Sequence, residues 1–357
     1  MRALAVVVTT VTFTAACAHA GGRGGRLRPA TVSPTRRLEA IHRAQVWMAT
    51  DIPSMDLRIG PSGAGAFAPN QLVACDYVNR RLGGRSPKFL CAVAEHDEVK
   101  VKYGRDNGEV YAEVAATRLL WALGFGADRM YPVRVECHGC PANFRGPRRA
   151  GDLPVLVEPA AIERKMPGHV IETREGSGWA WPELDLVDES VGGAPRAHRD
   201  ALRLLAALIQ HTDSKPEQQR LMCPTPDPDG MTAGDICAKP FMMLDDVGQT
   251  FGHANRFNRD AAGSVNFDGW SRAAVWSDPE RCVANITKSI TGTLDHPVIS
   301  EDGRKFLAGL LVQLSDRQLH DLFDVARFEL RSHHPTDDWV EAFKRKRAEV
   351  LNQTCHN

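Results

Sequence analysis

The sequence has no excess of charge of either sign, because 44 lysines and arginines balance 44 aspartates and glutamates. Nucleic-acid-binding proteins normally carry a strong basic excess, so this balance argues against a nucleic-acid partner. The chain also has no internal repeat, and no low-complexity tract follows residue 35. Its apolar content of 43% is ample for a core. These features indicate a globular protein of one large domain or two smaller ones.

Several catalytic and metal-binding signatures are missing. No G-x-S-x-G elbow occurs, which argues against a serine hydrolase. Cys137-His-Gly-Cys140 has no second C-x-x-C to complete a zinc knuckle, and no histidine follows its second cysteine as haem attachment would need. A structural crosslink is the favoured interpretation of this pair, and half of a zinc site or a redox pair are the alternatives.

The first twenty residues predict a targeting segment, because residues 3–16 are apolar but too few to span a bilayer comfortably. Two processing routes are open. Ala18-His-Ala20 is a signal-peptidase site before Gly21, whereas Thr14-Ala-Ala-Cys17 resembles a bacterial lipobox whose cysteine would be lipidated. An uncleaved anchor is a third possibility. We expect export to the periplasm or cell envelope, with membrane association only through a lipid on Cys17.

Export changes what the cysteines predict. Without Cys17 an even number remains, and in an oxidising compartment this indicates disulfides. Local spacing suggests two pairs, Cys75 with Cys91 and Cys223 with Cys237. The eight cysteines are Cys75, Cys91, Cys137, Cys140, Cys223, Cys237, Cys282 and Cys355.

The secondary-structure pattern divides the chain into regions. Residues 21–36 are rich in Gly, Arg and Pro and predict a flexible tether, followed by a strand-rich region over 37–165 and a helical region over 166–357. In the helix expected over 196–210, the apolar positions share one face, and Arg199, Asp200 and Arg203 should face water. The other expected elements are a hairpin of strands 88–94 and 99–103, a helix over 108–123, strands over 133–137, 155–162 and 241–244, a helix capped by Ser315 and Gln318, and a last helix carrying Trp339, Phe343 and Val350.

One segment carries most of the functional signal. His211-Thr-Asp-Ser-Lys-Pro-Glu-Gln218 follows the apolar helix, and it resembles the protein-kinase catalytic loop H-R-D-L-K-P-E-N, with glutamine in place of the asparagine. Downstream, strand 241–244 leads into Asp245-Asp-Val-Gly248, which resembles D-F-G. Upstream, Val99-Lys-Val-Lys102 resembles the V-A-I-K strand, and Glu113 lies on the next helix. The order of these elements matches the protein-kinase-like superfamily over residues 82–252, nearest its atypical and secreted branches.

The resemblance implies Mg²⁺ and ATP as cofactors and a role for each residue. Asp213 would orient the attacking hydroxyl, and Lys215 would neutralise charge on the transferred phosphoryl group. Gln218 and Asp246 would hold Mg²⁺, while Lys102 would contact phosphates.

Glu113 would orient Lys102, because a carboxylate on a weakly polar helix face needs a partner. Lys100 is the reserve candidate for that pairing. The loop before the hairpin lacks G-x-G-x-x-G, but its Gly83, Gly84, Ser86 and Lys88 could bind phosphate.

Three features depart from the family pattern. Residues 220–240 insert a Pro- and Gly-rich excursion, Gln218 lengthens a metal ligand by one methylene, and no A-P-E motif follows the D-V-G.

We therefore predict an α+β, two-lobed protein-kinase-like fold with a helical C-terminal extension. The predicted function is phosphoryl transfer from a nucleotide to an unknown protein or small-molecule acceptor. ATP is scarce outside the cytoplasm, so a non-catalytic, pseudokinase-like envelope lipoprotein with a binding or scaffolding role is the first alternative. A thiol or metal protein built on Cys137 and Cys140 is the second.

Overall fold

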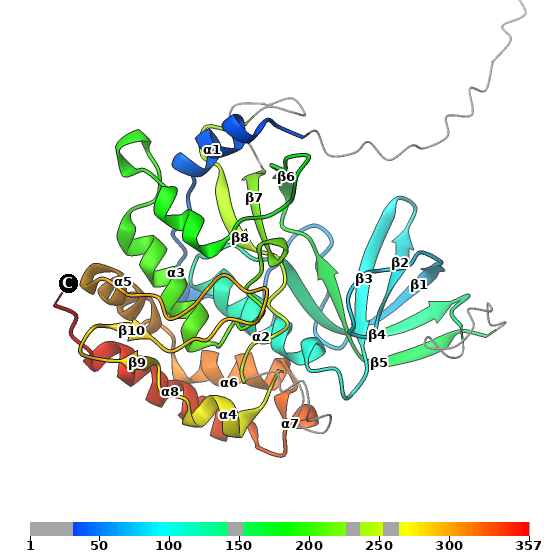
Figure 1. Ribbon diagram of the computed structural model, residues 1–357. Coiled ribbons are helices and arrows are strands. Elements are labelled where there is room, and N and C mark those ends of the chain that lie inside the picture. The colour runs from blue at the N-terminus through cyan, green and yellow to red at the C-terminus, as the bar shows by residue number, and fades with distance from the viewer. Residues whose placement is uncertain (1–30, 142–152, 226–235, 253–263, 357) are drawn as a thin grey trace, which may run out of the picture.

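The computed structural model describes residues 31–141, 153–225, 236–252 and 264–356. The predicted targeting segment, Cys17 and most of the predicted tether lie outside this part of the chain. The architecture is α+β, as expected, with a strand-rich unit at one end and most of the helices at the other (Figure 1).

A closed five-stranded barrel forms the strand-rich end, with the strand order β1-β2-β3-β5-β4. Neighbouring strands run antiparallel except β1 and β4, whose parallel pairing closes the barrel. Inward-facing apolar side chains from alternate positions fill a small core of its own. The strands are β1 (Leu72–Val78), β2 (Lys88–Ala94), β3 (Asp97–Tyr103), β4 (Arg129–His138) and β5 (Val155–Arg164).

Helix α2 (Glu109–Ala122) joins the barrel to the rest of the molecule. It packs against β4 and β5 on one side and against α6 (Asp316–Val325) on the other. Nearly every one of its residues is buried, and this explains a sequence that is apolar all round. The predicted hairpin over β2 and β3 and the predicted helix over α2 are both confirmed.

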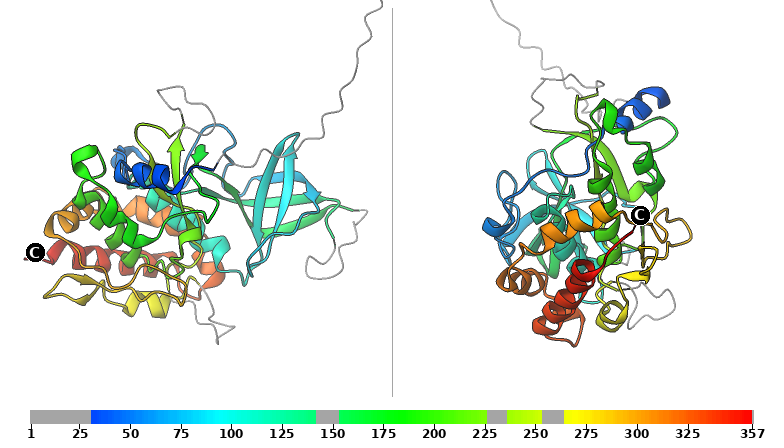
Figure 2. Two further views of the ribbon diagram at one scale, coloured as in Figure 1. Left: turned by 45° about the horizontal axis from the view of Figure 1, so that its top comes forward. Right: turned by 90° about the vertical axis from the view of Figure 1, so that its left-hand side faces the viewer.

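The second half combines helices with two small sheets (Figure 2). Its largest helix pair is α3 with α5, and α8 packs across α5 and α6. The capping box at Ser315 is present at the start of α6, as predicted. The remaining elements are α3 (Arg196–Leu208), α4 (Phe267–Arg272), α5 (Glu301–Leu311), α7 (Phe328–Arg331), α8 (Thr336–Asn352), β6 (Gly168–Val170), β7 (Gln219–Pro224), β8 (Phe241–Leu244), β9 (Trp276–Asp278) and β10 (Val283–Ala284).

Three predicted boundaries need correction. Residues 31–36 are not all tether, because Thr31 pairs with Glu172 and α1 (Pro34–His42) begins there, capped by Ser33. The start of the predicted strand-rich region lies against the second half, since Gln45 pairs with Phe241 of β8. The excursion predicted over 220–240 also begins differently, because its first residues form β7, which pairs with both β6 and β8.

The polar face predicted for α3 does not face water. Asp200 is 1% exposed and accepts hydrogen bonds from the backbone nitrogen and the hydroxyl of Ser300. Arg203 donates to Asp200 and Asp185, and Arg199 donates to the Leu184 carbonyl oxygen. Helical periodicity identifies the apolar face, but it cannot show that Ser300, at the start of α5, and residues Leu184 and Asp185 cover the polar one.

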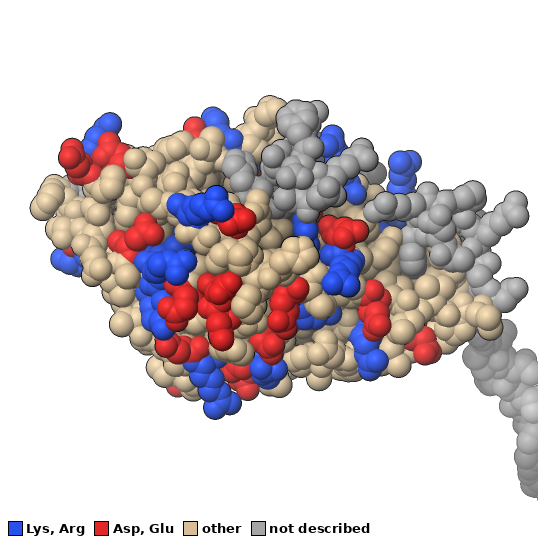
Figure 3. All heavy atoms as spheres, turned by 90° about the horizontal axis from the view of Figure 1, so that it is seen from below, with Lys and Arg blue, Asp and Glu red and all other residues tan. Residues whose placement is uncertain are grey.

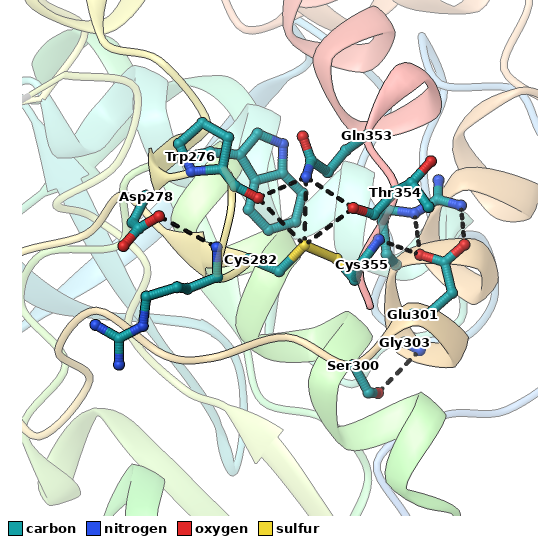
Figure 4. Close-up of a disulfide and its surroundings, with 12 residues drawn as sticks. Trp276, Asp278, Cys282, Ser300, Glu301, Gly303, Gln353, Thr354 and Cys355 are labelled. Atoms are coloured by element: carbon teal, nitrogen blue, oxygen red, sulfur yellow. Dashed lines mark hydrogen bonds and ion pairs between the residues drawn. A yellow bond between two sulfur atoms is a disulfide. The ribbon is translucent and has the colours of Figure 1, made fainter. Parts of the chain in front are cut away.

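Four disulfides crosslink the described chain. The two locally predicted pairs, Cys75–Cys91 and Cys223–Cys237, are confirmed, and Cys137 is bonded to Cys140. The fourth bond, Cys282–Cys355, ties the β9–β10 segment to the C-terminus beside Glu301 (Figure 4). Disulfides of this number are typical of oxidising compartments.

Acidic and basic side chains are interspersed on the face seen in Figure 3, in keeping with the zero net charge of the chain. Within the described ranges, no helix combines the length and apolar character that a membrane span requires.

Candidate functional site

A cavity of about 690 Å³ brings most of the predicted site residues together. The loop between β1 and β2, the start of α2, the loop after α3 and the segment after β8 all contribute to it. Its lining residues are Gly83, Gly84, Arg85, Ser86, Lys88, Glu109, Thr212, Asp213, Lys215, Gln218, Asp246, Gln249, Ser289 and Thr291. The two remaining predicted residues, Lys102 and Glu113, are buried directly behind Asp246.

Lys102 is the buried cation of the site. Strand β3 places it inside the protein with 0% exposure, and its Nζ donates to Glu113 Oε1 at 2.5 Å and to Glu109 Oε2 at 2.8 Å. Asp246 Oδ1 lies 3.6 Å from the same nitrogen. The reserve partner Lys100 instead pairs with Glu163 at 2.6 Å. The structure thus brings Lys102 and Glu113 together, and it adds Glu109, a carboxylate that the motif comparison did not single out.

Three carboxylates around one ammonium group shift the ionisation of the whole cluster. Burial acts against the charged form of Lys102, but Glu113, Asp246 and Glu109 together hold its pKa well above the usual value. Burial and the charge of Asp246 raise the pKa of Glu113 well above its ordinary value, although Lys102 opposes them. Burial also opposes ionisation of Asp246, but the charge of Lys102 and a hydrogen bond from the Gly248 backbone nitrogen hold its pKa well below the usual range. Asp246, which lines the cavity, is therefore ionised.

The loop after α3 presents Asp213 to the cavity. Lys215 Nζ donates to Asp213 Oδ2 at 3.2 Å, and Gln218 Nε2 donates to the same oxygen at 2.9 Å. The loop is joined to the segment after β8 because the Gln218 carbonyl oxygen accepts from the backbone nitrogens of Asp245 and Asp246. Asp213 and Asp246 are thereby held on one wall of the same cavity.

Buried groups behind the loop fix its shape. Ser214 is 0% exposed, and its hydroxyl accepts from the backbone nitrogens of Thr293 and Leu294. His211 is also fully buried, and neither ring nitrogen has a hydrogen-bond partner among the described residues. Burial lowers the pKa of His211 to about 4, so its ring is neutral at physiological pH. Both side chains support the loop from inside.

The loop between β1 and β2 forms the opposite rim. Gly84 has a φ of +85°, and a Cβ there would come within 2.7 Å of Lys88 Nζ, so only glycine lets the lysine amine lie against the backbone. Burial and the charges of Lys102 and Lys100 lower the pKa of Lys88. Among the described residues, none gives this amine a hydrogen bond or ion pair. A bound anion would supply that partner.

Oxygen ligands for a hard cation converge on the floor of the cavity. Atoms of Glu109, Glu113 and Asp246 lie within 4.8 Å of one another, and Glu113 Oε2 is buried without a hydrogen-bond partner in the described chain. The carboxylate and amide oxygens available here fit Mg²⁺. A Cβ at Gly248 would come 2.7 Å from Glu109 Cγ and 3.1 Å from Asp246 Oδ1, so this glycine allows the close approach of the two side chains.

A second buried ionic cluster lies beside the first. Asp128, Glu163 and Asp245 gather around Lys165, whose Nζ lies 2.7 Å from Asp128 and 2.8 Å from Asp245. Burial acts to lower the pKa of Lys165, but the three carboxylates outweigh it and raise that pKa. Because Asp245 precedes Asp246, this cluster anchors the segment that carries Asp246 to strands of the barrel.

Comparisons with known proteins add little to this geometry. No family model matches the chain, and no curated protein matches its sequence. Among solved structures, the chain is similar to the crystal structure of a Helicobacter pylori proinflammatory kinase, CtkA. The identity is 10% and the TM-score 0.46, over 80% of this chain and 96% of that one. We draw nothing about function from a likeness of that size.

Proposed function

We propose that this protein is kinase-like and transfers a phosphoryl group from Mg-ATP to an acceptor. The observation that carries the proposal is the single cavity in which Asp213, Lys215 and Asp246 face a glycine-rich loop, with the buried Lys102–Glu113 pair behind them. Phosphoryl transfer depends mainly on positioning and electrostatic stabilisation, and this arrangement supplies both. The two-lobed description, with the barrel as one lobe and the helical half as the other, belongs to the same proposal.

Each residue has a role that its position supports. Lys102, held by Glu113, contacts the α- and β-phosphates, and Lys88 with the backbone of Gly83, Gly84 and Ser86 binds the outer phosphates. Asp213 orients the acceptor hydroxyl and takes up its proton.

Lys215 donates to Asp213 in the structure, and it would stabilise charge on the transferred group. Asp246 and a second oxygen ligand, Gln218 in the motif comparison, would hold Mg²⁺, which neutralises the phosphates when bound.

We further propose that the protein acts outside the cytoplasmic membrane. The four disulfides support this location. The Cys137–Cys140 disulfide engages both sulfurs of the C-x-x-C pair, which disfavours the alternative of a zinc site at these residues.

Isothermal titration of the mature protein with Mg-ATP, together with a phosphate-release and autophosphorylation assay, tests the proposal. Asp246→Ala should abolish Mg-dependent nucleotide binding. Asp213→Ala should preserve binding and remove only transfer, because Asp213 acts mainly in the transition state. Wild-type binding without transfer to water, itself or a broad substrate panel would support the binding or scaffolding role instead. Absence of nucleotide binding would refute both.

A further inference from the structure

Glu109 occupies a position at the floor of the cavity that the kinase comparison leaves without a role. It begins α2, and its side chain retains 17% exposure, less than the 27% of Asp246 but more than the 3% of Glu113. One oxygen accepts from Lys102, and the other is 3.4 Å from Gln249 Nε2. A Cβ at Gly248 of the Asp-Val-Gly segment would come 2.7 Å from Glu109 Cγ, so the two residues lie close together.

The charges at this position do not balance. Among the described residues, Lys102 is the one cation in contact with Glu109, Glu113 and Asp246, so three carboxyl groups share a single cationic partner. Each of the two glutamates gives one oxygen to Lys102 and keeps a second that is weakly engaged or unengaged. The second oxygen of Glu113 is buried and has no hydrogen-bond partner among the described residues. A buried, unsatisfied carboxylate oxygen is costly, and a cation at this point would remove that cost.

The donor set identifies the kind of cation. Ligand atoms of Glu109, Glu113 and Asp246 lie within 4.8 Å of one another, and all are hard oxygens. Mg²⁺ and Mn²⁺ favour such ligands and usually keep several water molecules, which the adjoining cavity can hold. Gln218 is less well suited here, because its side-chain amide is directed at Asp213.

We propose that Glu109 and Asp246, supported by Glu113, form a divalent-cation site that fills before nucleotide binds. Glu109 takes the part that the motif comparison gives to Gln218. This proposal deepens the proposed function and rests on it only for the later arrival of nucleotide. Lys102 keeps its ion pairs, and the metal binds the carboxylate oxygens that do not contact Lys102.

Mn²⁺ alone, without nucleotide, is the probe, and its binding to the mature, disulfide-bonded protein is measured by calorimetry and by electron paramagnetic resonance. Wild type should bind one Mn²⁺. Glu109→Gln should weaken that binding about tenfold or more, and Glu109→Asp, which keeps the charge, should weaken it less. Asp106→Asn is the matched control, because Asp106 is exposed, lies just before α2 and should leave Mn²⁺ affinity unchanged. Melting curves in EDTA verify that each variant is folded.

The alternatives give different results. If Gln218→Ala weakens Mn²⁺ binding and Glu109→Gln does not, Gln218 holds the cation and the inference is overturned. If wild type binds Mg-ATP but no Mn²⁺ on its own, the inference fails while the proposed function stands. If wild type binds Mn²⁺ through Glu109 but no nucleotide, the cation site is established and the proposed function fails.

Discussion

Replacing Lys102 with methionine should destabilise the protein far more than the same change at Lys100, two residues earlier on β3. Methionine preserves most of the side-chain volume, so the main loss is charge. Lys102 is 0% exposed and contacts the carboxyl groups of Glu109, Glu113 and Asp246. Without the lysine, these three groups would lie together with no cation between them. Removing one partner of a buried ion pair typically costs about 3–5 kcal/mol.

Lys100→Met is the control, because Lys100 differs from Lys102 in its exposure and in having a partner that contacts a second cation. The Lys100 side chain is 24% exposed, and its partner Glu163 keeps Lys165 as a second cation. Lys100→Met should therefore cost about 1 kcal/mol or less. Urea unfolding under non-reducing conditions, without metal or nucleotide, measures both. Adding Asp246→Asn to Lys102→Met should recover part of the loss, because it removes the carboxylate charge that Lys102 neutralises most clearly. Equal destabilisation by the two lysine variants would refute this account of the site.

Two further predictions concern the C-terminal crosslink and its neighbour. Replacing Cys282 and Cys355 with serine opens a loop of 73 residues, and replacing Cys223 and Cys237 opens one of 14. The chain-entropy model therefore gives a loss of about 4 kcal/mol for the first pair and about 3 kcal/mol for the second. Denaturant midpoints in the reverse order would contradict it. The hydrogen bond from Arg304 lowers the pKa of Glu301 from 4.5 to about 2; burial opposes this shift, and the Cys355 backbone nitrogen adds to it. The ion pair therefore contributes its full stability above pH 4.5, and that contribution is lost as the pH falls toward 2. Glu301→Gln should lower the melting temperature at pH 7, and a gap from wild type that persists unchanged at pH 2 would count against the ion pair.

The parts of the fold that the sequence predicts are those set by local patterns. Strand β3 alternates apolar and polar residues after a tight turn that joins it to the apolar run of β2. Helix α2 is rich in alanine and leucine and ends before Gly124. The loop from His211 to Gln218 is recognisable because its residue types and spacing are specific. Such patterns depend on neighbours in sequence, so they are visible without a structure.

Features that depend on distant contacts are not predictable in this way. Strand β1 alternates buried and exposed residues, but its parallel pairing with β4 joins segments about sixty residues apart in sequence. The sequence pattern places Asp200 on the polar face of α3, but the residue is buried because the start of α5 covers it. Glu109 differs from other helix-starting glutamates through its ion pair with Lys102 of β3 and its proximity to Gly248, and neither can be read from the sequence. Cys282–Cys355 spans too long a loop for spacing to suggest it.

The separation of charge within the cavity is the strongest argument that it binds a ligand. A structural ion-pair network places opposite charges in contact, as around Lys165. Here the carboxylates of Glu109, Glu113 and Asp246 gather at the floor, whereas Arg85 and Lys88 stand at the glycine-rich rim. Such a separation is unfavourable in an isolated protein, since among the described residues the three carboxyl groups share Lys102 alone and the Lys88 amine has no anionic partner. A divalent cation bound to a polyphosphate carries both signs in this order, so one ligand would satisfy floor and rim together.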